Sequence, residues 1–222
     1  MKCRSYKKVK LSGIEIARCI EFCRQSAETQ QAIEFGQRDT APRDINEIAK
    51  DNFIGKLAEM AVVDMLRFDY GIHVSVNWEI YGIGEGDDCD MIIGNGWKVD
   101  VKSTKTGNWL LFDADKLKMR KNQKYNNLPD AIFMCRTLWD FENDRPTGEV
   151  ELIGAVSLKS LLDPNCNVHR FQKGDLLPGT NTKLQADNYG IRFDDLDHNW
   201  GKNIKHMMEN YPPRREELAM MV

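Results

Sequence analysis

The residues with the clearest chemical potential in this 222-residue chain lie between Asp90 and Lys102. Two short segments, CDMII (89–93) and WKVDVKS (97–103), are separated by the turn-forming residues Gly-Asn-Gly at 94–96. This pattern predicts two strands joined by a tight turn. We therefore expect a β-hairpin that carries the acidic residues of this stretch.

The spacing of polar and apolar residues predicts which side chains share a face of the hairpin. Side chains alternate along a strand, so Asp100 and Lys102 should point to one face and Val99 and Val101 to the core. The paired strand can place Asp90 beside Asp100. Two carboxylates and a lysine would then converge at the edge of a sheet.

These three residue types suit the hydrolysis of a phosphodiester. Mg²⁺ takes oxygen ligands, usually one or two carboxylates together with waters. A lysine beside the metal can orient or help deprotonate an attacking water, and its charge can stabilise the negative charge that develops at phosphorus. The alternative interpretation is that Lys98–Lys102 is an ordinary half-exposed strand with its polar residues outward.

A third acidic residue, Glu59, lies in a predicted helix ahead of the hairpin. At ~100° per residue it falls on the flank of the helix's apolar stripe rather than opposite to it. Gly55, one turn earlier, would leave room for another element to pack closely. The alternative is a surface glutamate that pairs with Lys56.

The elements that must position these residues follow from periodicity and capping signals. Apolar residues recur at helical spacing over 14–31. Asp44 and Glu47 form a capping-box pattern ahead of a longer helix that should end near residues 69–71. Further segments are predicted by their patterns as strands (73–78, 108–112, 131–135, 151–157) or as helices (113–126, 157–162, 203–210). This order indicates an α/β (α+β) fold, a central mixed sheet flanked by helices, with an N-terminal helical arm.

Composition places the chain among ordinary folded proteins. Its 31 Lys and Arg against 34 Asp and Glu give a formal net charge of −3, which argues against a general polyanion binder. We expect a single domain, 1–222, with an arm (1–44), a catalytic core (45–162) and a C-terminal extension (163–222). No apolar run approaches the ~20 residues of a membrane span, and no secretory signal is evident. Together with six cysteines that lack metal-site spacing, this predicts a cytoplasmic protein with reduced thiols.

Three pieces of the sequence follow one another as in a known family. These are Gly55-Lys-Leu-Ala-Glu59 on a helix, Asp90 at the start of a strand, and Asp100-Val-Lys102 on the paired strand. In this respect the chain resembles the PD-(D/E)XK nuclease superfamily, which includes many restriction endonucleases and phage or repair nucleases. The resemblance covers about residues 45–162, and the chain departs from the motif in having Cys89, not Pro, before Asp90.

The resemblance implies a restriction-endonuclease-like core and cleavage of nucleic acid with Mg²⁺, which Mn²⁺ could replace. It implies that Asp90 and Asp100 ligate the metal together with the Val101 carbonyl. In the same scheme Lys102 orients the attacking water, and Glu59 holds a second metal ion or its water.

Basic residues gather after the hairpin and would contact DNA phosphates if they form a helix near the active edge. They are Lys116, Lys118, Arg120, Lys121 and Lys124. The alternative interpretation is a solvated charged face.

The function implied by the resemblance is that of an endodeoxyribonuclease of restriction or phage/defence type. DNA is the expected partner, RNA is not excluded, no membrane is expected, and cutting both strands would favour a homodimer. Two alternatives stay open. One is a structure-specific or recombination and repair nuclease with exonuclease-like action, and the other is an inactive nucleic-acid-binding module of the same fold.

Overall fold

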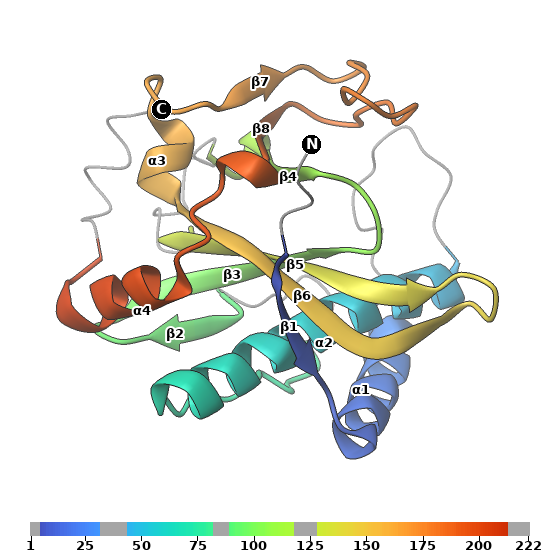
Figure 1. The fold of residues 1–222 in the computed structure, drawn as a ribbon. Helices are drawn as coiled ribbons and strands as arrows, with labels where there is room; N and C mark the ends of the chain where they lie inside the picture. Colours follow the sequence, from blue (N-terminus) through green and yellow to red (C-terminus); the bar gives the residue numbers. More distant parts are fainter. Residues whose placement is uncertain (1–4, 32–43, 82–88, 118–127, 213–222) are drawn as a thin grey trace. The chain divides into compact units, whose positions relative to one another are not determined.

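The structure, a computed structural model, describes residues 5–31, 44–81, 89–117 and 128–212. Its helices are α1 (Gly13–Gln31), α2 (Ile45–Tyr70), α3 (Leu158–Leu162) and α4 (Trp200–Glu209), with 3-10 helices η1 (Ala114–Leu117) and η3 (Phe193–Asp195). Its strands are β1 (Lys7–Lys10), β2 (Met91–Ile93), β3 (Trp97–Thr104), β4 (Trp109–Asp113), β5 (Ala131–Asp140), β6 (Arg145–Ser157), β7 (His169–Phe171) and β8 (Asn188–Arg192). Figure 1 shows a mixed α/β chain in which a mixed sheet is flanked by helices.

The chain divides into two compact units. Unit 1 holds residues 1–91, 101–107 and 133–153, and unit 2 holds 92–100, 108–132 and 154–222. Strands β2, β3, β5 and β6 each contribute residues to both units, and each unit is described by itself below.

The larger sheet has five strands in the order β1-β6-β5-β3-β2. Strand β1 pairs antiparallel with β6, and this register sets Lys8 against Glu151 and Lys10 against Glu149. Strand β3 runs parallel to β5, because the Lys98 backbone exchanges hydrogen bonds with Asp130 and, further along, Ser103 Oγ lies 3.0 Å from Thr137 Oγ1. The sheet therefore contains both antiparallel and parallel pairs.

In unit 1, helices α1 and α2 pack on each other (Figure 1). Cys19, Cys23 and Ala27 are buried on α1. The two predicted helices are confirmed, and so is the capping box, in which Asp44 accepts from the Glu47 backbone N–H at 2.9 Å and Glu47 accepts from that of Asp44. Helix α2 ends at residue 70, since Gly71 adopts the left-handed conformation that closes a helix.

In unit 2, a second sheet has the strand order β4-β8-β7 and is wholly antiparallel. The predicted strand at 108–112 and the helix around 203–210 are confirmed as β4 and α4. Strands β1, β7 and β8 carry no clear alternation and are not among the predicted elements. Of the helix predicted over 113–126, residues 114–117 form a 3-10 helix, and 118–126 lie outside the described residues.

The prediction of a strand at residues 73–78 is wrong, since these residues have no regular secondary structure. Polar groups of this segment pair with side chains instead of with a neighbouring strand. Lys56 Nζ donates to the Asn77 carbonyl at 3.0 Å, and the Asn77 side-chain oxygen accepts from the Glu79 backbone at 2.9 Å. Trp78 packs edge-to-face on Phe22, with ring centroids 5.5 Å apart.

Candidate active site

The predicted hairpin is confirmed as β2 and β3 with a turn at residues 94–96. Gly94 and Gly96 both have positive φ, of 58° and 96°, a conformation that glycine adopts without a steric penalty. The burial along β3 alternates as expected. Trp97, Val99 and Val101 are buried, whereas Asp100 and Lys102 are partly exposed.

Asp90 lies immediately before β2 and is tied to the middle of β3. Its Oδ2 accepts the backbone N–H of Val101 at 2.5 Å. A carboxylate thus occupies the place where a ladder carbonyl of the neighbouring strand would otherwise accept this hydrogen bond. The hairpin therefore fixes the Asp90 side chain beside the peptide that joins Asp100 to Val101.

The face of β3 that carries Lys102 can be identified from contacts in unit 1. Thr137 Oγ1 on β5 lies 3.0 Å from Ser103 Oγ and donates to the Ile54 carbonyl of α2 at 3.2 Å. Ser103 consequently projects toward α2. Because side chains alternate, Lys102 projects from the opposite face of the strand, and so does Asp100, whose Oδ2 is shielded from solvent.

Glu59 is buried on α2, with 7% of its surface exposed. Its Oε2 lies 2.7 Å from Lys56 Nζ, so the pairing considered from the sequence occurs, although it is buried rather than at the surface. The same ammonium lies 4.7 Å from the Phe22 ring centroid. The close packing expected at Gly55 is wrong, because a Cβ there would meet no atom within 4 Å.

The two thiols of α1 lie in this buried environment. Burial, with a smaller contribution from the Glu59 charge, raises the pKa of Cys19 to about 12. Burial raises the pKa of Cys23 to about 12 as well. Such thiols stay protonated at neutral pH and are poor nucleophiles. The described cysteines, Cys19, Cys23, Cys89, Cys135 and Cys166, are free thiols.

The C-terminal end of α4 holds the hairpin turn in unit 2. Asn95 donates from its side chain to the Met208 carbonyl at 3.1 Å, and Trp97 Nε1 donates to the Asn210 carbonyl at 2.8 Å. Gly94 lies so close that a Cβ there would overlap the Met207 carbonyl. The contact between α4 and the hairpin turn was not predicted from the sequence. The amphipathic pattern of α4 indicates only that one side of the helix is buried, without identifying the turn as its partner.

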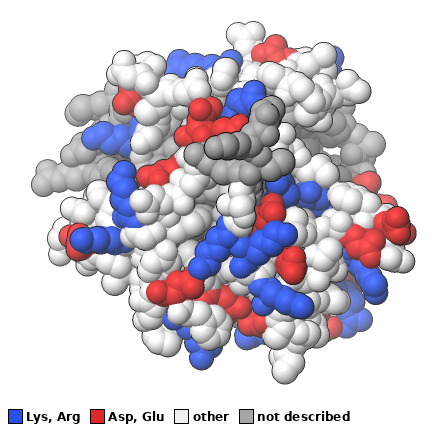
Figure 2. All heavy atoms as spheres, viewed as in Figure 1, with Lys and Arg blue, Asp and Glu red and all other residues white. Residues whose placement is uncertain are grey.

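Of the predicted DNA-contacting residues, only Lys116 lies in the described part of the chain. It belongs to η1, and its Nζ lies 6.0 Å from the Phe112 ring centroid. Lys118, Arg120, Lys121 and Lys124 lie outside the described residues. On the face shown in Figure 2, basic and acidic side chains are interspersed among the described residues.

The donors near Asp90 are of the kind that Mg²⁺ prefers, since Asp90, Asp100 and the Val101 carbonyl all offer oxygen. Within the described ranges, no group of three or more His, Cys, Asp and Glu side chains is arranged to hold a metal ion. A magnesium site needs only one or two carboxylates, so the residues present fit a site built on two. The role of Glu59 as a metal ligand stays a prediction.

No helix in the described segments is sufficiently long and apolar to cross a membrane. The chain matches no protein-family model, no curated protein and no solved structure.

Proposed function

We propose that this chain is a Mg²⁺-dependent deoxyribonuclease with a restriction-endonuclease-like core, most simply an endonuclease. The observation that carries the proposal is the 2.5 Å hydrogen bond from the Val101 N–H to Asp90. It ties one acidic residue to the peptide beside a second, Asp100, with Lys102 two residues further along the same strand face.

Asp90 and Asp100, with the Val101 carbonyl, would hold the metal. Bound Mg²⁺ would supply Lewis-acid polarisation of a phosphate oxygen. The hydrogen bond to the backbone fixes the Asp90 carboxylate before any substrate binds, which lowers the cost of ordering it. The partial burial of Asp100 reduces the water around it and strengthens its interaction with a cation.

Lys102 would act on the water and the phosphate. Its ammonium can hold the attacking water by hydrogen bonding and can offset negative charge that develops on the phosphate oxygens. Because it projects from the same face of β3 as Asp100, it can meet the phosphate that the two carboxylates position.

The test is cleavage of supercoiled plasmid, linear duplex and single-stranded DNA by the full chain, with Mg²⁺ and with EDTA. Lys102→Ala should abolish Mg²⁺-dependent cleavage. The matched control is Lys98→Ala, which removes a lysine from the same face of the same strand and should leave cleavage unchanged.

Each result has a distinct meaning. Discrete fragments would support an endonuclease, and degradation to short products would favour the repair or exonuclease-like alternative. No cleavage of any DNA, combined with metal-independent DNA binding, would overturn the proposal in favour of an inactive binding module. Equal cleavage by both lysine variants and the parent would show that Lys102 has no part in the reaction.

A further inference from the structure

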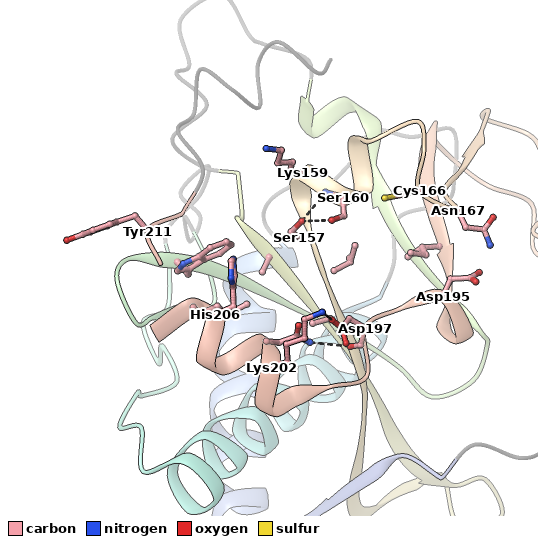
Figure 3. Close-up of a pocket in the computed structure, with 17 residues that line it drawn as sticks. Ser157, Lys159, Ser160, Cys166, Asn167, Asp195, Asp197, Lys202, His206 and Tyr211 are labelled. Carbon is pink, nitrogen blue, oxygen red and sulfur yellow. Dashed lines mark hydrogen bonds and ion pairs between the residues drawn. The ribbon is translucent and has the colours of Figure 1, made fainter. Parts of the chain in front are cut away.

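The three-stranded sheet of unit 2 has a core face and an outer face. Directly opposite residues of an antiparallel pair share a face, so the registers of β4, β8 and β7 assign each side chain to one of the two. The core face carries Leu110, Phe112 and Ile191, which are buried. Ile191 lines a cavity of about 700 Å³ in unit 2, to which β3, β6, α3 and α4 also contribute (Figure 3).

The outer face is rich in aromatic rings, and we call it the aromatic face. It carries Trp109, Leu111 and Asp113 of β4, Asn188, Gly190 and Arg192 of β8, and His169 and Phe171 of β7. His169 and Arg192 are exposed, and Trp109 and Phe171 are half-buried. The outer face of an antiparallel sheet is usually polar, and exposed apolar patches mark binding surfaces.

Three rings of the aromatic face are in mutual contact. The Trp109 ring meets the rings of His169 and Phe171 edge-to-face, with centroids 5.0 Å and 5.4 Å away. The His169 and Phe171 rings are nearly parallel, with centroids 5.9 Å apart. Gly190 leaves space for Phe171, because a Cβ there would lie 2.5 Å from its ring. Trp109 Nε1 also donates to the Pro178 carbonyl at 3.2 Å. The rings are therefore ordered before any ligand binds, which lowers the cost of binding.

A cation lies beside these rings. Arg192 is directly opposite Trp109, and its guanidinium carbon lies 5.7 Å from the centroid of the Trp109 ring. Asp113 is the acidic residue of the aromatic face and lies at the other end of β4, opposite Asn188. Its carboxylate accepts the Asp115 backbone N–H at 2.9 Å. The end of the face that holds Trp109 thus combines aromatic rings with a positive charge.

This combination matches the chemistry of a single nucleic-acid strand. Unpaired bases stack on aromatic side chains, and an arginine beside the rings attracts the phosphate backbone. A double helix does not offer the faces of its bases, because they are stacked on one another and must be extruded to be reached. The rings therefore favour a strand with unpaired bases over a duplex.

We infer that the aromatic face of unit 2 binds single-stranded DNA, with bases stacked on Trp109 and His169 and a backbone phosphate at Arg192. Phe171 positions the Trp109 ring through their edge-to-face contact. The choice of DNA rests on the proposed nuclease function. A nuclease with such a face would prefer substrates that contain single-stranded segments over a blunt duplex.

The test is binding of fluorescein-labelled oligothymidylate to the full chain in EDTA, measured by fluorescence anisotropy. The parent chain should bind this strand, and an unlabelled blunt duplex should compete poorly. His169→Ala should weaken binding about tenfold, the usual effect of losing one stacked ring, whereas His169→Phe, which keeps a ring, should retain it. Because His169 is exposed, neither change should affect folding. Phe141→Ala, which removes an exposed aromatic side chain from the turn after β5, should leave binding unchanged.

A second pair of variants tests the phosphate contact. Arg192→Ala should reduce the slope of log affinity against log salt concentration by about 0.7, the contribution of one phosphate contact to a single strand. The matched control is Arg170→Ala. Arg170 is an exposed arginine of the same sheet, but it lies opposite Tyr189 on the other face, so its removal should leave the slope unchanged.

Several results would overturn the inference. They are absence of binding to the labelled strand, unchanged affinity in His169→Ala, and equal losses of affinity in His169→Ala and Phe141→Ala. Competition by the blunt duplex as strong as that by unlabelled oligothymidylate would show that unpaired bases are not recognised, and would overturn it as well. Stronger competition by oligouridylate than by oligothymidylate would assign the face to RNA and overturn the assignment to DNA.

Failure of this inference is distinguishable from failure of the nuclease proposal, because the binding assay needs neither Mg²⁺ nor cleavage. Cleavage of DNA by a chain whose strand binding is unaffected by His169→Ala would overturn the assignment of the aromatic face alone. Strand binding that depends on His169, without cleavage of any DNA, would overturn the nuclease proposal alone.

Discussion

Asp90 and Glu59 are acidic residues of the same sequence pattern, but their surroundings in unit 1 differ. The Glu59 carboxylate lies against the Lys56 ammonium, 2.7 Å away, in a site where each side chain is about one-tenth exposed. The Asp90 carboxylate accepts from a neutral backbone N–H at the edge of a strand. A buried cation beside Glu59 supplies the opposite charge locally, whereas a backbone N–H orients the Asp90 carboxylate.

This difference shows that a sequence motif can identify acidic residues, but it does not reveal which of them form an ion pair with a buried lysine. A carboxylate neutralised by a buried lysine contributes chiefly to holding α2 and the following segment together, since the same lysine also donates to the Asn77 carbonyl. A carboxylate aligned by the backbone is better suited to bind an external cation. The comparison predicts separate losses of activity and of stability.

We expect the substitution Asp90→Asn to have the largest effect, and this effect is on the rate of cleavage. The amide oxygen can still accept the Val101 N–H, so the fold should persist, but the negative charge is lost. We expect Mg²⁺-dependent cleavage to fall about 10³-fold, equivalent to about 4 kcal/mol of activation free energy. The measurement is the initial cleavage rate together with a denaturant unfolding curve.

Asp140→Asn is the matched control, because Asp140 also accepts backbone N–H groups, those of Glu142 and Asn143 in an exposed turn. Its cleavage rate should equal that of the parent chain. An Asp90→Asn variant that cleaves normally while fully folded would remove Asp90 from the active site.

The next effect is expected on stability from Glu59→Gln. Removing one partner of a buried ion pair leaves the Lys56 ammonium uncompensated, and we expect unfolding to become easier by about 3 kcal/mol. The double change Lys56→Met with Glu59→Leu should recover most of this loss. The measurement is the free energy of unfolding from urea titration.

Glu21→Gln provides the control for an exposed pair, since Glu21 contacts Arg24 on the surface of α1, and it should leave stability nearly unchanged. Cleavage per folded molecule then separates the two roles of Glu59. Retention of cleavage in the Glu59→Gln variant would limit Glu59 to structure, and loss of cleavage with an intact fold would restore its predicted role as a metal ligand.

The hairpin was predictable from the sequence because its determinants are local. Alternation along β3 and the Gly-Asn-Gly turn specify both strands within 15 residues, and the same holds for the capping box of α2. Residues 73–78 also alternate, yet there the long-range contacts of Lys56 and Phe22 with Asn77 and Trp78 override the local pattern. Alternation predicts a strand only where a neighbouring strand is available to pair.

The contacts between the hairpin turn and α4 could not be predicted, because they are also long-range contacts. Asn95 and Trp97 bond to carbonyls 113 residues away, and no spacing rule connects such positions. The cavity of unit 2 likewise joins side chains from β3, β6, α3 and α4. Sequence patterns identify the strand that holds Asp100 and Lys102, and tertiary packing determines what surrounds it.

A smaller effect on stability is expected from Gly94→Ala, which tests the contact between the turn and α4. An alanine there would adopt positive φ and its Cβ would overlap the Met207 carbonyl, with Met208 Cα at 3.0 Å. We expect a loss of about 2 kcal/mol in unfolding free energy. The measurement is again urea titration.

Gly96→Ala is the control in the same turn. It also has positive φ, but a Cβ would meet no atom within 4 Å, so its cost is the backbone strain alone. Equal losses in the two variants would show that the close approach of α4 to Gly94 contributes nothing.

The smallest effect concerns Asp64, a buried residue of α2 and a third acidic environment to set beside Asp90 and Glu59. Burial, and then the charge of Glu15, raise the pKa of Asp64 above its ordinary value of 3.8, and Arg67 opposes the shift. A raised pKa in the folded state means that the stability contributed by the protonated acid is fully present below pH 3.8 and is lost as pH rises through the folded pKa. Asp64→Asn, which stays neutral, should therefore gain stability relative to the parent chain as pH rises from 4 to 8.

The check on Asp64 is the difference in unfolding free energy between variant and parent across that range. The control is Asp51→Asn, on the exposed side of the same helix. It measures how the loss of one carboxylate from α2 changes the free energy of unfolding when the carboxylate is not buried. If the Asp64→Asn difference stayed constant with pH, or declined as pH rose, burial of an unneutralised carboxyl would not govern this position. If the stability difference between Asp64→Asn and the parent rises with pH, the three acidic residues have three different partners. Asp90 accepts a backbone N–H, Glu59 pairs with a lysine, and Asp64 binds a proton.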